Sequence, residues 1–148
     1  MLITHMIQKI NTQLDGELLN INELCDVIDK SIDDINTRLN TRFPVLSELL
    51  LQNKGNVTEY TAIPDKYIRT VVIPGAVFKF YINDEEGASV APKHEEEFLK
   101  GLFYMERDYI NQVPEEFQDT SEQGYLKDPF FGKHKEGEFT IDGSVFQL

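Results

Sequence analysis

The sequence predicts a mainly α-helical protein, in which a small four-helix domain over residues 1–113 precedes an extended C-terminal arm over residues 114–148. Four segments carry apolar residues at spacings of three and four, which place those residues on one face of a helix. Turn-forming Gly, Pro and Asn residues separate the segments. Beyond Pro114 the composition changes to charged residues, Gly and Pro with scattered aromatic rings. We therefore expect one helical core and one segment that lies outside it.

The first two expected helices cover residues 3–14 and 21–40. Asp15-Gly16 ends the first, because Gly readily adopts the left-handed conformation of a helix C-terminus. Asn20 and Glu23 have the spacing of a capping box at the start of the second. Pro44 prevents the second from continuing. Its apolar face comprises Ile21, Leu24, Cys25, Ile28, Ile32, Ile35 and Leu39.

Two further helices are expected in the second half of the domain. Pro64 begins the third, which reaches Ile82; its run of β-branched residues at 70–73 would also suit a strand. Pro74-Gly75 predicts a kink within it, because Pro removes a backbone hydrogen bond. The fourth opens at Pro92 and ends before Pro114. Residues 45–51 are expected to add one or two helical turns, and residues 53–56 a loop.

The expected core combines one face of each of the last three long helices. Residues on a helical stripe are buried when the helix packs on its neighbours. The predicted interior residues are Leu24, Ile28, Ile32, Ile35, Ile68, Val72, Leu99, Leu102 and Phe103.

The composition excludes several classes of protein. The chain has 148 residues, the size of a single domain with tails, and a net charge of −12 from 26 acidic and 14 basic residues. The basic residues do not cluster in the sequence, so duplex DNA and anionic membranes are unfavourable partners. No apolar run approaches the roughly 20 residues of a membrane helix. The start of the chain lacks a signal-peptide pattern, which favours the cytoplasm. Cys25, the single cysteine, cannot form an internal disulfide or a thiolate metal site.

No pattern of catalytic, metal-binding or cofactor-binding residues emerges. His5, His94 and His134 are too dispersed for paired metal ligation, and residues 83–87 do not continue into a calcium loop. Asp33 and Asp34 diverge by about 100° on a helix and are expected on its solvated face. Isolated glycines form no phosphate-binding loop. We therefore expect a protein without enzymatic activity, cofactor or bound metal.

The C-terminal arm carries the main candidate residues for partner binding. They are Tyr125, Phe130, Phe131, Phe139 and Phe146, which lie within a polar segment without helical periodicity. Such rings either fold back on the domain or bury against a partner, and the compact core already supplied by the helices favours the partner. Asp142-Gly143 predicts a terminal β-hairpin. Arg107 is a further candidate, for a subunit contact or a local ion pair.

Three segments give the chain a resemblance to the small helical head-tail adaptor (connector) proteins of tailed bacteriophages. They read SIDDIN at residues 31–36, IPDKYIRTVVIPGA at 63–76 and FLKGLFYMERDY at 98–109. The resemblance covers about residues 1–113 as an order of helices and implies a virion structural protein assembled in the host cytoplasm. It implies a ring, commonly of twelve copies, between the portal protein and the stopper or tail, through which DNA passes without specific binding. The tail after Gly137 departs from that pattern.

The acidic composition suits this expectation and also an alternative. Carboxylates that face a DNA conduit repel phosphate and let the DNA slide. Carboxylates also imitate phosphates in acidic DNA-mimic proteins, which occupy a host DNA-binding protein. A small helical hydrolase is a third class. Self-assembly separates the first two, because an adaptor forms or joins rings whereas a mimic is a monomer or dimer.

Overall fold

A computed structural model describes residues 1–14, 20–83 and 89–119. Contacts divide the chain between Phe117 and Gln118, and the unit Met1–Phe117 is considered by itself. The described part of this unit is mainly helical and contains no β-strand, and an isolated bridge joins Leu2 to Glu59. The predicted turns at residues 15–16 and 84–87, the arm beyond residue 119 and the terminal hairpin lie outside the described residues.

Each of the four expected long helices is present. α1 spans Ile3–Thr12, α2 spans Ile21–Leu39 and α6 spans Ala91–Tyr109. The third expected helix is one continuous run of α4 (Asp65–Tyr67), a π-helical turn η1 (Ile68–Val72) and α5 (Ile73–Ile82). A short fifth helix, α3 (Leu46–Gln52), accounts for the turns expected after Pro44. The 3₁₀ turns η3 (Ile110–Gln112) and η4 (Glu115–Phe117) follow α6.

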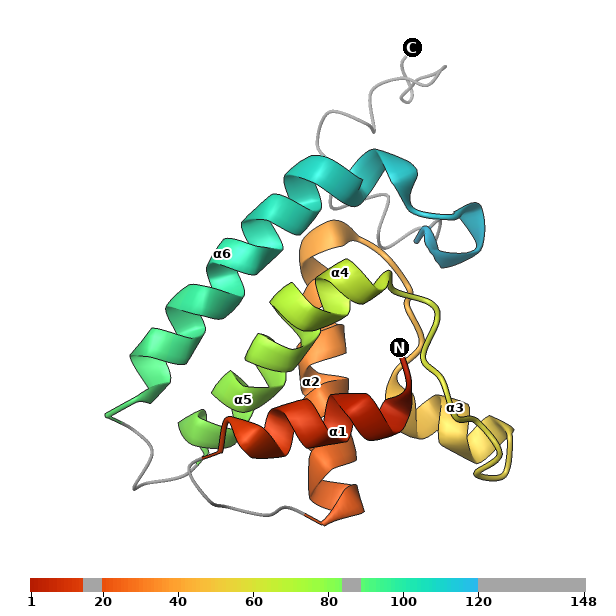
Figure 1. Ribbon diagram of the computed structural model, residues 1–148. Coiled ribbons are helices and arrows are strands. Elements are labelled where there is room, and N and C mark those ends of the chain that lie inside the picture. Colours follow the sequence, from red (N-terminus) through yellow and green to blue (C-terminus); the bar gives the residue numbers. More distant parts are fainter. Residues whose placement is uncertain (15–19, 84–88, 120–148) are drawn as a thin grey trace, which may run out of the picture. The chain divides into compact units, whose positions relative to one another are not determined.

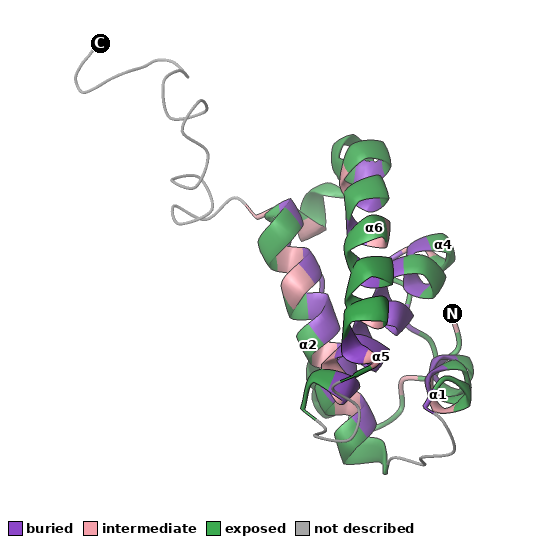
Figure 2. Ribbon diagram, turned by 90° about the vertical axis from the view of Figure 1, so that its left-hand side faces the viewer, coloured by how far each residue is buried: buried purple, intermediate pink, exposed green. Residues whose placement is uncertain are grey.

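The long helices pack around α5. Figures 1 and 2 show α5 between α1 on one side and α2 on the other, with α6 alongside. Contacts of α5 with α2 and with α6 are the most extensive in the unit. The buried residues face this central helix (Figure 2). The third predicted helix is therefore the one around which the others assemble.

The capping box predicted at the start of α2 is confirmed. The Asn20 side chain accepts a 2.9 Å hydrogen bond from the amide of Glu23, whose carboxylate accepts one of 3.2 Å from the amide of Asn20. At the other end Asn40 adopts a left-handed conformation with φ of 56°. Both ends of α2 are therefore set by local residues.

Pro74 alters the central helix without ending it. The amide of Ile73 donates to the carbonyl of Ile68, five residues back, which makes residues 68–72 a π-helical turn. In an α-helix the ring of Pro74 would collide with the carbonyl of Thr70, and Pro74 has no N–H to offer it. The predicted disturbance at Pro74 is thus a wider turn that immediately precedes the proline, and the helix continues through it.

Two glycines let neighbouring helices approach this segment closely. A Cβ atom at Gly75 would lie 2.2 Å from Oγ of Ser31 on α2, and a Cβ atom at Gly101 would lie 2.3 Å from the carbonyl oxygen of Thr70. The buried hydroxyl of Ser31 donates a 2.8 Å hydrogen bond to the carbonyl of Val72. α2 and α6 therefore meet the backbone of the central helix directly.

Most predicted interior residues are buried, but two predictions are wrong. Leu24, Ile28, Ile32, Ile35, Ile68, Val72 and Leu102 are buried. Leu99 and Phe103 are instead about half exposed, at 47% and 52%. The buried stripe of α6 already consists of Phe98, Leu102, Met105 and Tyr109, so residues one position further along point about 100° away from the core.

The helical unit extends a few residues past the expected boundary at residue 113. The carbonyl of Phe117 accepts a 2.7 Å hydrogen bond from the amide of Arg42, and its ring lies 5.4 Å from that of Phe43. η4 therefore packs beside the turn that follows α2.

We expect Gly101→Ala to destabilise the unit, although replacing Gly by Ala inside a helix ordinarily stabilises by about 0.5–1 kcal/mol. The new methyl group would meet the Thr70 carbonyl, a backbone atom that cannot rotate away. Overpacking of this kind costs about 1–3 kcal/mol. Chemical denaturation measures the change, with Lys100→Ala at the exposed neighbouring position as the control. Equal or greater stability of Gly101→Ala would contradict the close approach.

Candidate interaction surface on helix α6

Besides its buried stripe, α6 has a second, solvent-exposed face that is largely apolar. This face, called here the α6 outer face, consists of Leu99, Phe103, Tyr104, Arg107 and Ile110. The four apolar members are exposed by 47%, 52%, 41% and 36% in that order. Contiguous exposed apolar groups on a folded unit are typical of interaction surfaces.

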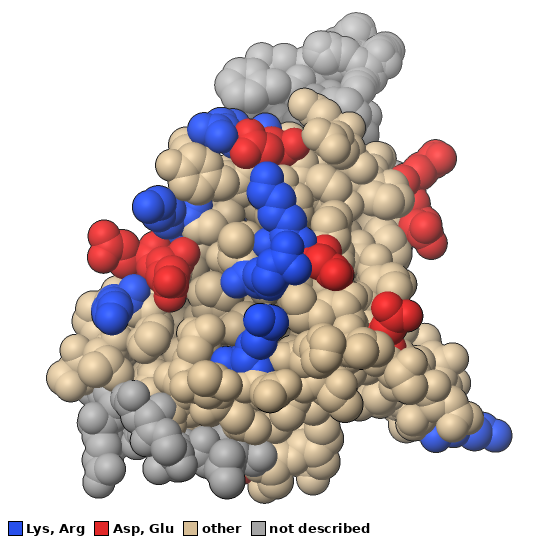
Figure 3. All heavy atoms as spheres, viewed as in Figure 1, with Lys and Arg blue, Asp and Glu red and all other residues tan. Residues whose placement is uncertain are grey.

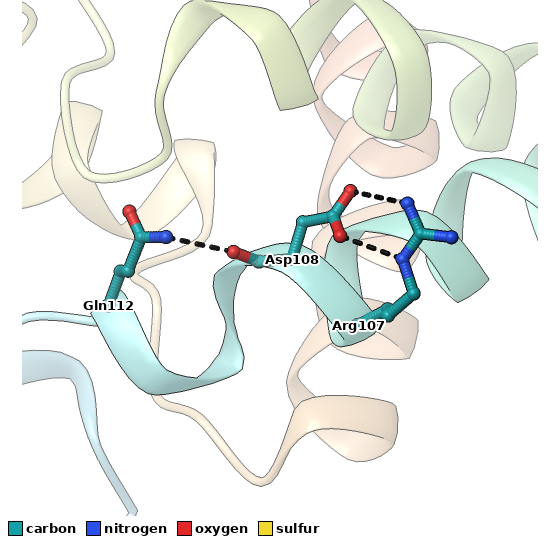
Figure 4. A network of polar contacts seen from close by, with 3 residues as sticks. All are labelled: Arg107, Asp108 and Gln112. Atoms are coloured by element: carbon teal, nitrogen blue, oxygen red, sulfur yellow. Dashed lines mark hydrogen bonds and ion pairs between the residues drawn. The ribbon is translucent and has the colours of Figure 1, made fainter.

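Polar contacts hold Arg107 in place on this face. Its guanidinium donates to both oxygens of Asp108, at 2.7 Å from Nε and 3.0 Å from Nη2 (Figure 4). Cζ lies 4.8 Å from the centroid of the Tyr104 ring, a cation–π contact. Gln112 donates a 3.0 Å hydrogen bond to the Asp108 carbonyl. The local ion pair expected as one alternative for Arg107 is present, and a subunit contact stays a prediction.

The ion pair also shifts the titration of both partners. The hydrogen bond from Arg107, and then its charge, lower the pKa of Asp108. The same hydrogen bond and the negative charge of Asp108 raise the pKa of Arg107. Both groups remain ionised across the neutral range. A partner that docks on the α6 outer face would meet a planar guanidinium beside the ring of Tyr104.

The helix that carries the face is anchored to the rest of the unit. Nε of Arg38 on α2 lies 3.0 Å from Oε1 of Glu106, between the inner and outer sides of α6. The ring of Tyr109 lies 5.2 Å from that of Tyr67. Together with the close contact at Gly101, these interactions place the outer face on a rigid element, which lowers the entropy lost on binding.

The aromatic candidates of the arm, Tyr125, Phe130, Phe131, Phe139 and Phe146, lie outside the described residues. The structure therefore brings Arg107 together with residues that the sequence analysis did not select. Leu99 and Phe103 were assigned to the core, and Tyr104 and Ile110 were not singled out. The sequence feature that could have revealed them is the number of apolar residues on α6, which exceeds what a single buried stripe accommodates.

Other titratable groups of the described residues form no coherent reactive site. Cys25 is half-buried, and burial followed by the charge of Asp29 raises the pKa of its thiol, so the thiolate is scarce. Burial, then Asp29 and Asp34, raise the pKa of Asp33. Asp34 instead forms a 2.7 Å ion pair with Lys79.

His94 stacks on Tyr81 with ring centroids 5.0 Å apart, and His5 is exposed; His134 lies outside the described residues. Across residues 1–14, 20–83 and 89–119, no three His, Cys, Asp or Glu side chains are grouped as metal ligands. Within the same ranges, no helix is both long and apolar enough to cross a membrane.

The outer face makes little contribution to folding, and this can be measured. We expect Leu99→Ser and Phe103→Ser each to lower the free energy of unfolding by less than Leu102→Ala, because both side chains are already about half exposed. Leu102→Ala, between them on the buried face, should cost about 2–5 kcal/mol. Thermal or urea unfolding of the three variants tests the assignment. A large loss of stability in the Leu99 and Phe103 variants would show that these residues belong to the core.

Comparison of the chain with protein-family models, with curated protein sequences and with solved structures yields no match.

Proposed function

We propose that the protein is a virion structural protein of a tailed bacteriophage, a head-tail adaptor that forms a ring between the portal and the tail or stopper. The observation that carries the proposal is the α6 outer face. Exposed apolar and aromatic residues flank a fixed arginine on an anchored helix, and Tyr, Phe and Arg are residues that dominate protein interfaces. The adaptor-like strings of the sequence include this helix.

The proposed role assigns a task to each part of the chain. Copies of the helical unit form the ring, with twelve as the expected number, and the α6 outer face contacts the portal or the tail-side protein. The aromatic residues between Tyr125 and Phe146 anchor in a neighbouring subunit or in the portal, because aromatic rings bury large areas. The net charge of −12 suits a conduit that lets DNA pass without holding it.

The charge distribution supports the DNA-mimic alternative less well than the adaptor proposal. A mimic imitates the regular row of phosphates along a duplex. The face in Figure 3 instead carries Lys and Arg down its middle, with Asp and Glu side chains next to them in several places. Five of the described carboxylates that belong to α2, α4 or α6 are also engaged in ion pairs, namely Asp26, Asp34, Asp65, Glu106 and Asp108.

Assembly tests the proposal directly. We expect the full chain, alone or mixed with the portal protein of the phage that encodes it, to form rings in mass photometry and negative-stain images. Leu99→Ser with Phe103→Ser should abolish portal binding while leaving the fold intact. Ile82→Ser, at a 55% exposed position on α5, is the matched control and should bind normally. A monomer that never joins the portal, or that captures a basic DNA-binding protein, would overturn the proposal.

The arm supplies a separate prediction. Deleting residues 125–148 should leave the helical unit folded, because the buried residues that the structure describes all lie at or before Val113, and should prevent incorporation into a portal-bound ring. Circular dichroism reports the first effect and co-sedimentation with the portal reports the second. Replacing the five aromatic residues by Ser in the full-length chain shows whether the effect of the deletion comes from the aromatic side chains or from the length of the arm. Unfolding of the truncated chain would show that the aromatic residues belong to the core.

A further inference from the structure

The fold gathers cations that are far apart in the sequence. Lys9 of α1 and Arg69 of η1 line one hollow of about 590 Å³, together with His5, Gln8, Thr12, Gln13 and Ile73. Lys66 lies one turn before Arg69 on the same helix. Figure 3 shows Lys and Arg side chains in a line down this face, in a chain whose net charge is −12. We call this region the cationic hollow.

The charge of the cationic hollow is only partly compensated by its neighbours. Within the described residues Lys9, Lys66 and Arg69 form no ion pair, although Asp65 interacts with the charge of Arg69 and Asp108 with the charge of Lys66. The nearest acidic neighbour in the sequence, Asp65, forms a 2.8 Å ion pair with the amino group of Met1. The polar side chains in the lining leave further donors available, so the hollow suits a partner that brings carboxylates.

The outer side of α2 and the adjoining α3 have the opposite charge. Asp26, Asp29, Asp33 and Glu48 lie here, and Lys30 pairs only with Asp26, at 3.1 Å. The raised pKa of Asp33, caused first by burial and then by Asp29 and Asp34, agrees with this crowding of carboxylates.

Apolar groups border the same carboxylates. A second hollow of about 540 Å³ lies between the two helices, and Asp26 and Asp29 share its lining with Ile21 and Leu51. Ile21 is exposed by 51% and Leu51 by 81%. We call this region, with the four carboxylates, the acidic face.

These two surfaces lie on opposite sides of the unit. α5 is packed between α1, which carries part of the cationic hollow, and α2, which carries the acidic face (Figures 1 and 2). Different, complementary patches on opposite sides of one chain generate a head-to-tail contact, which closes into a ring when the rotation between copies allows it.

We propose that the cationic hollow of one copy binds the acidic face of the next copy, and that this contact joins neighbouring subunits of the ring. The inference rests on the proposed function and specifies which surfaces of the ring meet. Exposed ion pairs contribute only about 0–1 kcal/mol each, so they orient the contact. Burial of Ile21 and Leu51 supplies the apolar part. Duplex DNA fits the hollow less well, because three cations meet few phosphates and the whole chain repels the rest.

Charge reversal tests the contact with the full-length chain. We expect Lys9→Glu with Arg69→Glu to abolish rings in mass photometry, and Asp33→Lys with Glu48→Lys to do the same. Each of these side chains is exposed, so folding should persist, which circular dichroism verifies. The chain with all four substitutions should regain rings, and so should an equimolar mixture of the two reversed chains. Lys54→Glu with Lys93→Glu makes the same change of net charge as Lys9→Glu with Arg69→Glu, at exposed positions elsewhere, and should assemble normally.

The outcomes separate this contact from the adaptor role. Rings that persist in both reversed variants, or that the four-substitution chain fails to regain, overturn the contact and leave the adaptor proposal standing. Failure of the unmodified chain to assemble, alone or with the portal, overturns both. Duplex DNA that binds the unmodified chain in fluorescence anisotropy, and no longer binds after Lys9→Glu with Arg69→Glu, would assign the hollow to phosphate and also overturn the contact.

Discussion

The close approach of three helices at the π-helical turn η1 is the constraint on which the rest of the unit depends. Pro74 prevents a regular α-helix at this point, and the wider turn exposes backbone carbonyls to the neighbouring helices. Ser31 donates a hydrogen bond to the carbonyl of Val72, and Gly101 lies against the carbonyl of Thr70. A buried carbonyl without a partner would cost about 1–3 kcal/mol, so the bond from Ser31 offsets part of the cost of the distortion.

This contact also determines where α6 shows its second apolar face. Gly101 must point toward Thr70, and Phe98, Leu102 and Met105 then turn into the core. With that side of α6 in contact with the central helix, Leu99 and Phe103 lie on the other side and are about half exposed. The interaction surface proposed for the portal or tail is therefore a geometric consequence of the packing around η1.

The distribution of charge follows the same arrangement of helices. α5 separates α1 from α2, and within the described residues no ion pair joins a cation of the cationic hollow to a carboxylate of the acidic face. Charges without an ion-pair partner in one subunit favour association with a subunit of opposite surface charge. They set the orientation of the contact and add little to its affinity. A ring of such subunits would combine salt-sensitive lateral contacts with an apolar face for a different partner.

The sequence by local chemistry predicts the helices, the capping box at Asn20 and Glu23 and the buried face of α2, whereas the continuity of the helix at Pro74 became clear only in the structure. The predicted features depend on residues within about one turn of each other. Tertiary structure decided the rest. Apolar spacing on α6 is compatible with either stripe being buried, and only the contact at Gly101 selects one. Lys9 and Arg69 are sixty residues apart, so their shared hollow exists only once α1 packs beside η1.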